Sequence, residues 1–232
     1  MSRSNNTNTA NPATRFFEWS GSTGQIKYYD KEKGENVFIE LPFTFLVLDQ
    51  LSTITGYSDE TQSGIWSNEV KNLKLEPLTV RTKQGILGAG MYESVKNLKG
   101  VRFTKSIYIA YYNDDKELVI GNFKATGASL SAWIEFSRGK NVFDGAVTIT
   151  KAVQAKKGAT KYFIPDFQTK SDVSEETNAK ANELDKQLQK YLNDYLDSAP
   201  AEQEFNSYTP VPPMAFDGAD HDDQEDDDEI PF

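Results

Sequence analysis

The chain of 232 residues contains no cysteine and only one histidine. The absence of Cys excludes disulfides, thiolate nucleophiles and Cys-based metal sites. His221 lies in an acidic stretch near the C-terminus, so the rest of the chain cannot form a Ser–His or Cys–His catalytic pair. We therefore predict no enzymatic activity, no metal site and no cofactor. Catalysis by a pair of the scattered carboxylates is the enzymatic alternative that the sequence leaves open.

Long apolar runs are also missing. No segment approaches the roughly 20 apolar residues needed to cross a bilayer. The N-terminus has no apolar core of a secretory signal. These absences, together with the absence of Cys, predict a cytoplasmic protein without a membrane partner.

Negative charge is concentrated at one end of the chain. The net charge is −10, but residues 1–170 carry +5, residues 171–216 carry −6 and residues 217–232 carry −9. A mildly basic body permits nucleic-acid binding without proving it.

Most of the chain has the composition of β-strands. From Arg15 onward, short runs rich in Phe, Tyr, Ile, Val and Thr alternate with Gly and Asn/Asp turn signals. The clearest strand is Val101–Tyr112. Its alternation places Arg102, Tyr108 and Tyr112 on an outward face and Lys105 on the side of the core.

One short helix interrupts this pattern. Leu130, Trp133 and Ile134 have helical spacing within residues 127–136, and two further strands follow. An OB-fold has this order of elements: three strands, then a helix, then a closing pair of strands. We therefore predict a mainly β protein whose residues 15–170 form a five-stranded Greek-key barrel with extra hairpins.

Residues 171–197 are predicted to form a long amphipathic helix. Leu184, Leu188, Tyr191, Leu192 and Tyr195 form a single apolar stripe. We expect this stripe to dock on the barrel, with self-association or a partner helix as the alternative. The flanking segments are predicted to be a disordered arm at residues 1–14, a Pro-rich linker at 198–216 and a disordered acidic tail at 217–232.

Binding of single-stranded nucleic acid requires cations along a backbone path and aromatic faces for bases. Both residue types alternate along the predicted strands and occupy the loops between them. Core packing is the alternative role for Tyr108 and Tyr112. The candidate DNA-binding residues are Lys27, Tyr29, Arg81, Lys83, Lys96, Lys99, Arg102, Lys105, Tyr108, Tyr112, Lys124, Lys156 and Lys157.

The tail combines nine acids with three apolar residues at its end, Ile230, Pro231 and Phe232. An apolar tip on an acidic tether suits capture by a basic pocket with a hole for Phe232. The ending Asp226-Asp227-Asp228-Glu229-Ile230-Pro231-Phe232 resembles the acidic tip of bacterial and phage single-stranded-DNA-binding proteins.

This resemblance implies a protein that coats single-stranded DNA without sequence preference in phage replication, recombination and repair, in the cytoplasm of the host. It also implies that residues 226–232 recruit replication and recombination proteins such as a polymerase, a helicase, a primase or a nuclease. The chain is expected to be a monomer or a dimer. The alternatives are a protein–protein adaptor with a nucleic-acid-mimicking tail and a strand-annealing recombination protein.

Overall fold

The computed structural model describes residues 10–197, and the predicted linker and tail lie outside this range. The prediction of a mainly β protein with a short and a long helix is confirmed. The elements are β1 (Arg15–Ser20), β2 (Gln25–Asp30), β3 (Glu35–Ile39), β4 (Phe43–Ser58), β5 (Ser63–Ser67), β6 (Leu78–Thr82), β7 (Gly85–Gly90), α1 (Tyr92–Val95), β8 (Val101–Tyr112), β9 (Leu118–Thr126), α2 (Gly127–Ser137), β10 (Ala146–Lys157), β11 (Thr160–Lys170) and α3 (Glu175–Asp197).

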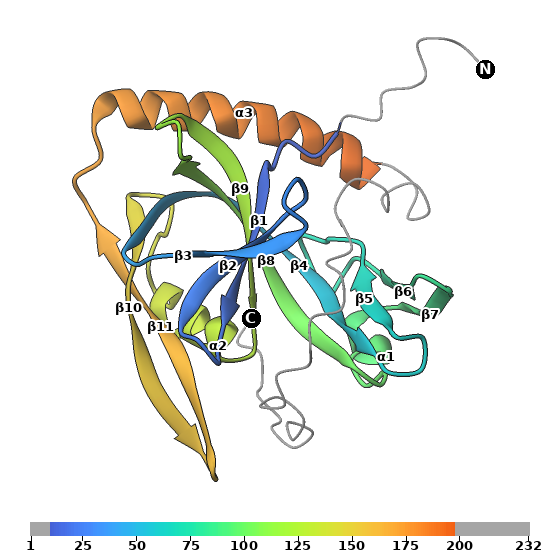
Figure 1. The fold of residues 1–232 in the computed structure, drawn as a ribbon. Helices are drawn as coiled ribbons and strands as arrows, with labels where there is room; N and C mark the ends of the chain where they lie inside the picture. Colours follow the sequence, from blue (N-terminus) through green and yellow to red (C-terminus); the bar gives the residue numbers. More distant parts are fainter. Residues whose placement is uncertain (1–9, 198–232) are drawn as a thin grey trace.

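The strands form one open mixed sheet in the order β3-β2-β1-β9-β8-β4-β5-β6-β7 (Figure 1). β10 branches from the start of β4 and pairs with β11 in a long hairpin. Strands β4, β8 and β9, then α2, then β10 and β11 follow one another as the OB-fold prediction requires. However, β1 pairs in parallel with β9, and no ladder among the described residues joins β11 to β9. The sheet is therefore not closed, and the predicted barrel is not confirmed.

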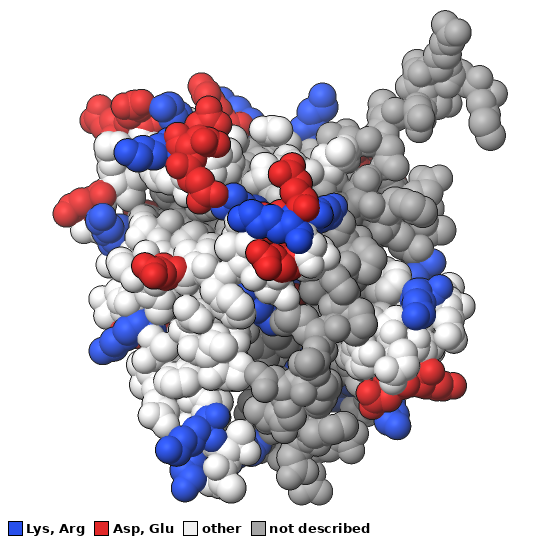
Figure 2. Space-filling view, in the orientation of Figure 1, with Lys and Arg blue, Asp and Glu red and all other residues white. Residues whose placement is uncertain are grey.

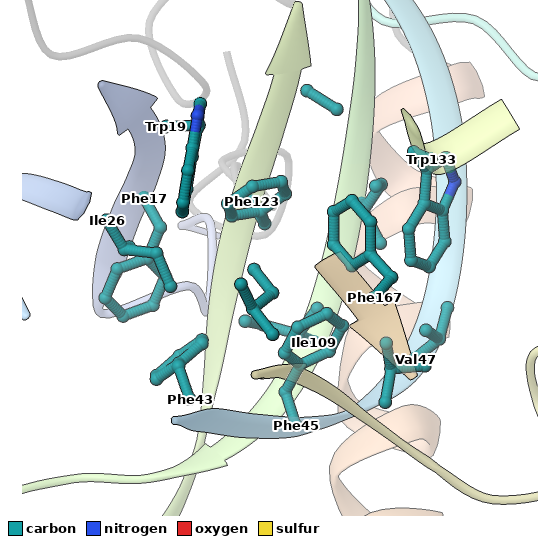
Figure 3. Close-up of a cluster of buried hydrophobic side chains, with 14 of the residues drawn as sticks. Phe17, Trp19, Ile26, Phe43, Phe45, Val47, Ile109, Phe123, Trp133 and Phe167 are labelled. Atoms are coloured by element: carbon teal, nitrogen blue, oxygen red, sulfur yellow. The ribbon is translucent and has the colours of Figure 1, made fainter. Parts of the chain in front are cut away.

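The largest core lies on one side of this sheet (Figure 3). Phe17, Phe45, Ile109 and Phe123 come from four different strands and are at most 1% exposed. Trp133 of α2 packs edge-on against Phe167 of β11, with ring centroids 5.2 Å apart. The apolar residues that predicted α2 thus close one end of this core. We call this side of the sheet the core face.

Helix α3 covers part of the opposite side, which we call the helix face (Figure 1). Leu188, Tyr191, Leu192 and Tyr195 are buried against residues of β4, β8 and β9, among them Leu51. The predicted stripe therefore docks on the sheet. The helix begins at Glu175, where the Ser174 hydroxyl accepts a hydrogen bond from the Thr177 N–H at 3.2 Å, and not at the predicted residue 171.

Residues 59–100, between β4 and β8, form a second small unit. Strands β5, β6 and β7 with the one-turn helix α1 enclose a third apolar cluster that includes Ile54, Ile65, Leu78 and Val80. This unit extends the sheet on the side away from the β10–β11 hairpin (Figure 1).

Residues 1–14 are the predicted disordered arm, and the last residues of this arm contact the sheet. Thr14 donates its N–H to the carbonyl of Ile120 at 2.8 Å, and the Asn11 side chain donates to the Tyr108 hydroxyl at 3.3 Å. The prediction is therefore wrong for residues 11–14, because their polar groups have partners on β8 and β9. Residues 1–9 lie outside the described part of the chain.

Candidate nucleic-acid interface

A row of aromatic and basic residues crosses four strands of the sheet. Trp66 on β5 pairs with Arg81 on β6 and with Thr55 on β4, and Thr55 pairs with Arg102 on β8. Cross-strand partners point to the same side of a sheet. Thr55 also lies four residues along β4 from Leu51, which contacts α3. All four side chains therefore lie on the helix face, with Trp66 between the two arginines in the row.

A second row crosses the other half of the same face. Lys124 on β9 pairs with Glu18 on β1, Glu18 with Lys27 on β2, and Lys27 with Phe38 on β3. The ring of Phe38 is 46% exposed. Lys27 and Glu18 form an ion pair at 3.8 Å, so one acid accompanies the two lysines. Tyr29 lies two residues from Lys27 and thus on the same face.

The structure thus brings five of the predicted residues onto one face of one sheet. They are Lys27, Tyr29, Arg81, Arg102 and Lys124. Lys124 is only 8% exposed, and its Nζ lies 5.9 Å from the centroid of the Phe16 ring. Lys124 is therefore buried beneath the helix face and does not extend into solvent.

Lys83 follows β6 at the edge of the first row. Its Nζ donates to the carbonyl of Gln62 at 3.5 Å, and the Tyr57 hydroxyl donates to the Gln62 side chain at 3.3 Å. Tyr57 lies two residues beyond Thr55 on β4 and extends the aromatic surface.

The prediction that Tyr108 can stack on a base is wrong. Its side chain is 0% exposed, and its hydroxyl donates to Glu69 at 2.8 Å. Burial, followed by the Glu69 charge, raises the pKa of Tyr108 well above its usual value. The physical reason is that the apolar stripe of α3 docks on this end of the helix face. The Tyr108 side chain does point away from the core face, as alternation predicts, but it packs against α3 and does not reach solvent.

Two further residues of β8 also lie outside the two rows. Tyr112 is 52% exposed, but its hydroxyl is hydrogen-bonded to Thr177 of α3 at 2.9 Å. Lys105 points to the core face, where it donates to the Ser52 hydroxyl at 3.3 Å. Desolvation by burial lowers the pKa of Lys105, and the Asp49 charge opposes this shift.

The remaining predicted lysines are exposed residues in turns and at strand ends. Lys96 follows α1 and forms an ion pair with Glu93 at 2.9 Å, and Lys99 precedes β8. Lys156 and Lys157 lie at the end of the β10–β11 hairpin, where Figure 2 shows basic side chains gathered. Ala152 and Phe163 of this hairpin pack against the largest core cluster, so the hairpin lies on the core face, on the side of the molecule away from β5–β7 (Figure 1).

Three aromatic residues of the face, Trp66, Phe38 and Tyr57, are absent from the sequence-based candidates. Trp66 follows Ile65 in the run Ser63–Ser67, where buried and half-buried residues alternate strictly. The sequence signal that was available is the adjacency of Ile65 and Trp66 in one strand: neighbouring residues point to opposite faces, so an inward Ile65 places Trp66 on the other face.

The chain was compared with protein-family models, curated proteins and solved structures, and none of the three comparisons found a match. Within residues 10–197, no group of three or more His, Cys, Asp or Glu is placed to hold a metal ion. No helix in this range has both the length and the apolar character needed to cross a bilayer.

Proposed function

We propose that this protein binds single-stranded DNA without sequence preference, and that the strand lies on the helix face beside α3. The observation that carries the proposal is the placement of Trp66 between Arg81 and Arg102 in one cross-strand row. Bases of any sequence stack on an indole ring, and the guanidinium groups on either side pair with phosphates.

The part of the helix face near Trp66 is where we place the strand. The Trp66 row ends at Arg102 on β8, and the Phe38 row starts at Lys124 on β9 of the same sheet. Between the two rows, Thr104 and Ser106 of β8 are 0% exposed, and Ser106 donates to the buried Glu69. Covered residues therefore separate the rows, and the Phe38 row is a second patch of aromatic and basic groups on this face.

The connectivity of the sheet also supports the proposal. We propose that β4, β8, β9, β10 and β11, with α2 before β10, form a variant of the OB-fold in which β1 occupies the closing position beside β9. OB-folds bind oligonucleotides across the face of their second and third strands, which correspond here to β8 and β9. Helix α3 covers this face at Tyr108 and Ile120, so the exposed Arg102 end of β8 is the part that we propose binds DNA.

The direct test is fluorescence anisotropy of a labelled oligo(dT) with the full-length protein. Binding is expected to weaken steeply with salt, with a slope of log K against log[salt] near −0.7 per neutralised phosphate. A mixed-sequence oligonucleotide is expected to bind with similar affinity. The absence of binding at low salt, or a response independent of salt, would contradict the proposal.

We further propose that residues 226–232 recruit replication and recombination proteins. The support is chemical: acids followed by Ile230, Pro231 and Phe232 suit a basic pocket with an apolar hole. These residues lie outside the described part of the chain. Deleting Ile230–Phe232 is expected to abolish partner recruitment in a pull-down and to leave the affinity for oligo(dT) unchanged. A loss of DNA affinity would contradict this assignment.

A further inference from the structure

A groove of about 560 Å³ lies between α2 and residues 71–74 of the β5–β6 connection. Its floor is formed by β4 and β8, where Ser52 pairs with Lys105. Phe103 also lines the groove and follows Arg102 along β8, so the groove lies on the core face, on the other side of the sheet from the Trp66 row. Its volume is within the range of about 300–1,000 Å³ typical of ligand sites. The groove is therefore a candidate site that is separate from the helix face.

Positive charge surrounds this groove. Lys105 lies on its floor, Lys71 and Lys74 lie on the wall formed by the β5–β6 connection, and Arg138 lies at the end of α2 on the opposite wall. None of the described residues that line the groove is an acid. The carboxylate of Asp49 is 3.9 Å from the Lys71 ammonium, so an acid beside the groove offsets part of this charge. The groove as a whole therefore favours an anionic ligand.

Lys105 gives this preference a physical basis. Its side chain is half-buried, and its ammonium donates to a neutral partner, the Ser52 hydroxyl, at 3.3 Å. Desolvation by burial lowers the pKa of Lys105, and the charge of Asp49 opposes this shift only in part. A cation withdrawn from water is costly unless an anion compensates it. An anionic group that entered the groove would provide that compensation.

The positions of the four cations favour a chain of anions over a single compact ion. They come from three separate segments, namely residues 71–74, β8 and the end of α2, and so lie around the groove instead of on one element. The half-buried side chains of Phe103, Leu130 and Ile134 add apolar surface within the same groove. A nucleic-acid strand carries one phosphate per nucleotide, with a base beside it that stacks on aromatic side chains. The lining therefore matches a short segment of single-stranded nucleic acid.

An acidic segment of a partner protein is the alternative ligand, and two observations favour nucleic acid over it. Trp133, the largest apolar side chain of the lining, is 1% exposed, and its indole N–H donates to Gln50 at 2.9 Å. This ring therefore fills the core and does not form a hole for the apolar anchor of a peptide. In addition, a strand bound on the helix face brings further nucleotides to the same molecule at high effective concentration.

We propose that this groove is a second contact site for single-stranded DNA, with phosphates beside Lys105 and Arg138 and a base against Phe103 and Leu130. The inference rests on the proposed function, because a strand held at the Trp66 row supplies the DNA that reaches the core face. It also gives Lys105 a role, since this sequence-based candidate lies outside the two rows but lines the groove. A strand long enough to occupy both sites is bound more tightly than one that occupies a single site.

Site-specific crosslinking locates the strand directly. The chain has no Cys, so Ser137→Cys in the full-length protein places one thiol-linked photocrosslinker at the groove. The matched control is Ser131→Cys, at an exposed position of the same helix that does not line the groove. The probe is a labelled long oligo(dT) of about 30 nucleotides, which exceeds the roughly 4–16 nucleotides that one OB-fold covers. The Ser137→Cys protein is expected to crosslink several-fold more of it than the Ser131→Cys protein.

Two results of this experiment would overturn the proposal. The first is equal crosslinking by the Ser137→Cys and Ser131→Cys proteins. The second is competition by polyglutamate at a lower concentration than by unlabelled oligo(dT), because that order would identify an acidic protein segment as the ligand of the groove.

Charge variants measure what the groove contributes to binding. Lys105→Gln combined with Arg138→Gln is expected to weaken binding of the long oligo(dT) about tenfold. If each cation neutralises one phosphate, the slope of log K against log[salt] becomes shallower by about 1.4 in this variant, and by about 0.7 in Arg138→Gln alone, whose exposed position leaves the fold intact. Lys186→Gln combined with Lys190→Gln removes two exposed charges from α3 and should change neither quantity.

A short oligo(dT) of about 8 nucleotides fills a single site and separates this inference from the proposed function. Its binding is expected to depend on Trp66 and not on Lys105 or Arg138. If Trp66→Ala weakens binding of the short oligo(dT) but the groove variants leave binding of the long one unchanged, the groove inference fails alone. If the groove variants weaken binding of the long oligo(dT) and Trp66→Ala has no effect on either length, the helix-face proposal fails and the groove remains.

Discussion

Tyr108 donates its hydroxyl proton to Glu69 across 2.8 Å, and both side chains are buried beneath α3. The other carboxylate oxygen of Glu69 accepts from Ser106 at 2.6 Å, and the Glu69 N–H donates to the Tyr195 hydroxyl at 2.8 Å. This network connects β8, the β5–β6 connection and α3. The end of the helix face near Tyr108 is therefore structural, and the end near Trp66 is the candidate for binding.

Tyr108→Phe is expected to destabilise the protein without changing its affinity for oligo(dT). The substitution removes one donor from a buried carboxylate, which costs about 1–3 kcal/mol. Urea unfolding measures this loss, and anisotropy measures the affinity. Tyr112→Phe is the control, because Tyr112 is half exposed and its change should cost less than about 0.5 kcal/mol. A drop in DNA affinity at unchanged stability would return Tyr108 to the binding surface.

Trp66→Ala is expected to weaken oligo(dT) binding between about fivefold and 150-fold. One stacked base contributes about 1–3 kcal/mol, and 1.4 kcal/mol corresponds to a factor of ten. Trp66→Phe retains an aromatic face and should recover part of the affinity. Phe143→Ala removes an aromatic ring that is 53% exposed outside the two rows and should have no effect. Equal affinities for Trp66→Ala and Phe143→Ala would show that the Trp66 row does not contact DNA.

Arg81→Gln and Arg102→Gln are each expected to make the salt dependence of binding shallower. If each guanidinium neutralises one phosphate, the slope of log K against log[salt] changes by about 0.7 per substitution. Lys190→Gln removes one exposed charge from α3 and should change neither the slope nor the affinity at a fixed salt concentration. An unchanged slope in both arginine variants would exclude their contact with phosphates.

The Arg15–Asp114 ion pair is expected to make a small contribution to stability that depends on pH. Its 2.6 Å hydrogen bond, followed by the Arg15 charge, lowers the pKa of Asp114. A carboxyl whose pKa is lower in the folded state stabilises the protein above its unfolded pKa, near 4. This contribution is lost as the pH falls through the folded pKa. Because the Asp114 side chain is 80% exposed, solvent screening keeps it below about 1 kcal/mol.

Asp114→Asn tests this directly. Urea unfolding at pH 7 should show the variant slightly less stable than the parent protein, and the difference should shrink toward pH 3. Asp115→Asn, in the same turn, is the control and should show no such trend. A difference that grows on acidification would contradict the assigned role of the ion pair.

Local sequence patterns predicted the elements that depend on local contacts. The stripe from Leu184 to Tyr195 predicted both α3 and its docking, and the alternation in Val101–Tyr112 predicted β8. The position of β1 was not predictable in this way. Its partner β9 is more than 100 residues away, and nothing in Arg15–Ser20 indicates a parallel neighbour. The predicted closed barrel is not confirmed, because β9 pairs with β1 and not with β11.

The alternation of residues along strands predicted part of the candidate site, because alternation depends only on the local sequence. Alternation assigned Arg81, Arg102 and Lys27 to a surface, and the register then placed them on a single face. Tyr108 was misassigned because alternation distinguishes the two sides of a strand but does not reveal which side a distant helix covers. Trp66 was missed because its strand is only five residues long and lies within a polar stretch.

The pairing of β1 with β9 has a consequence for how the chain is made. Phe17 lies beside Phe123, so the first strand finds its neighbour only after more than 100 further residues have been synthesised. Until then, the β1 edge of the β1–β2–β3 meander is unpaired and has aromatic residues along it, in addition to the β3 edge, which stays unpaired in the folded sheet. Contacts this distant in sequence slow folding to the range of milliseconds to seconds. We therefore expect this edge to be a site of aggregation of the nascent chain until residue 126 has left the ribosome.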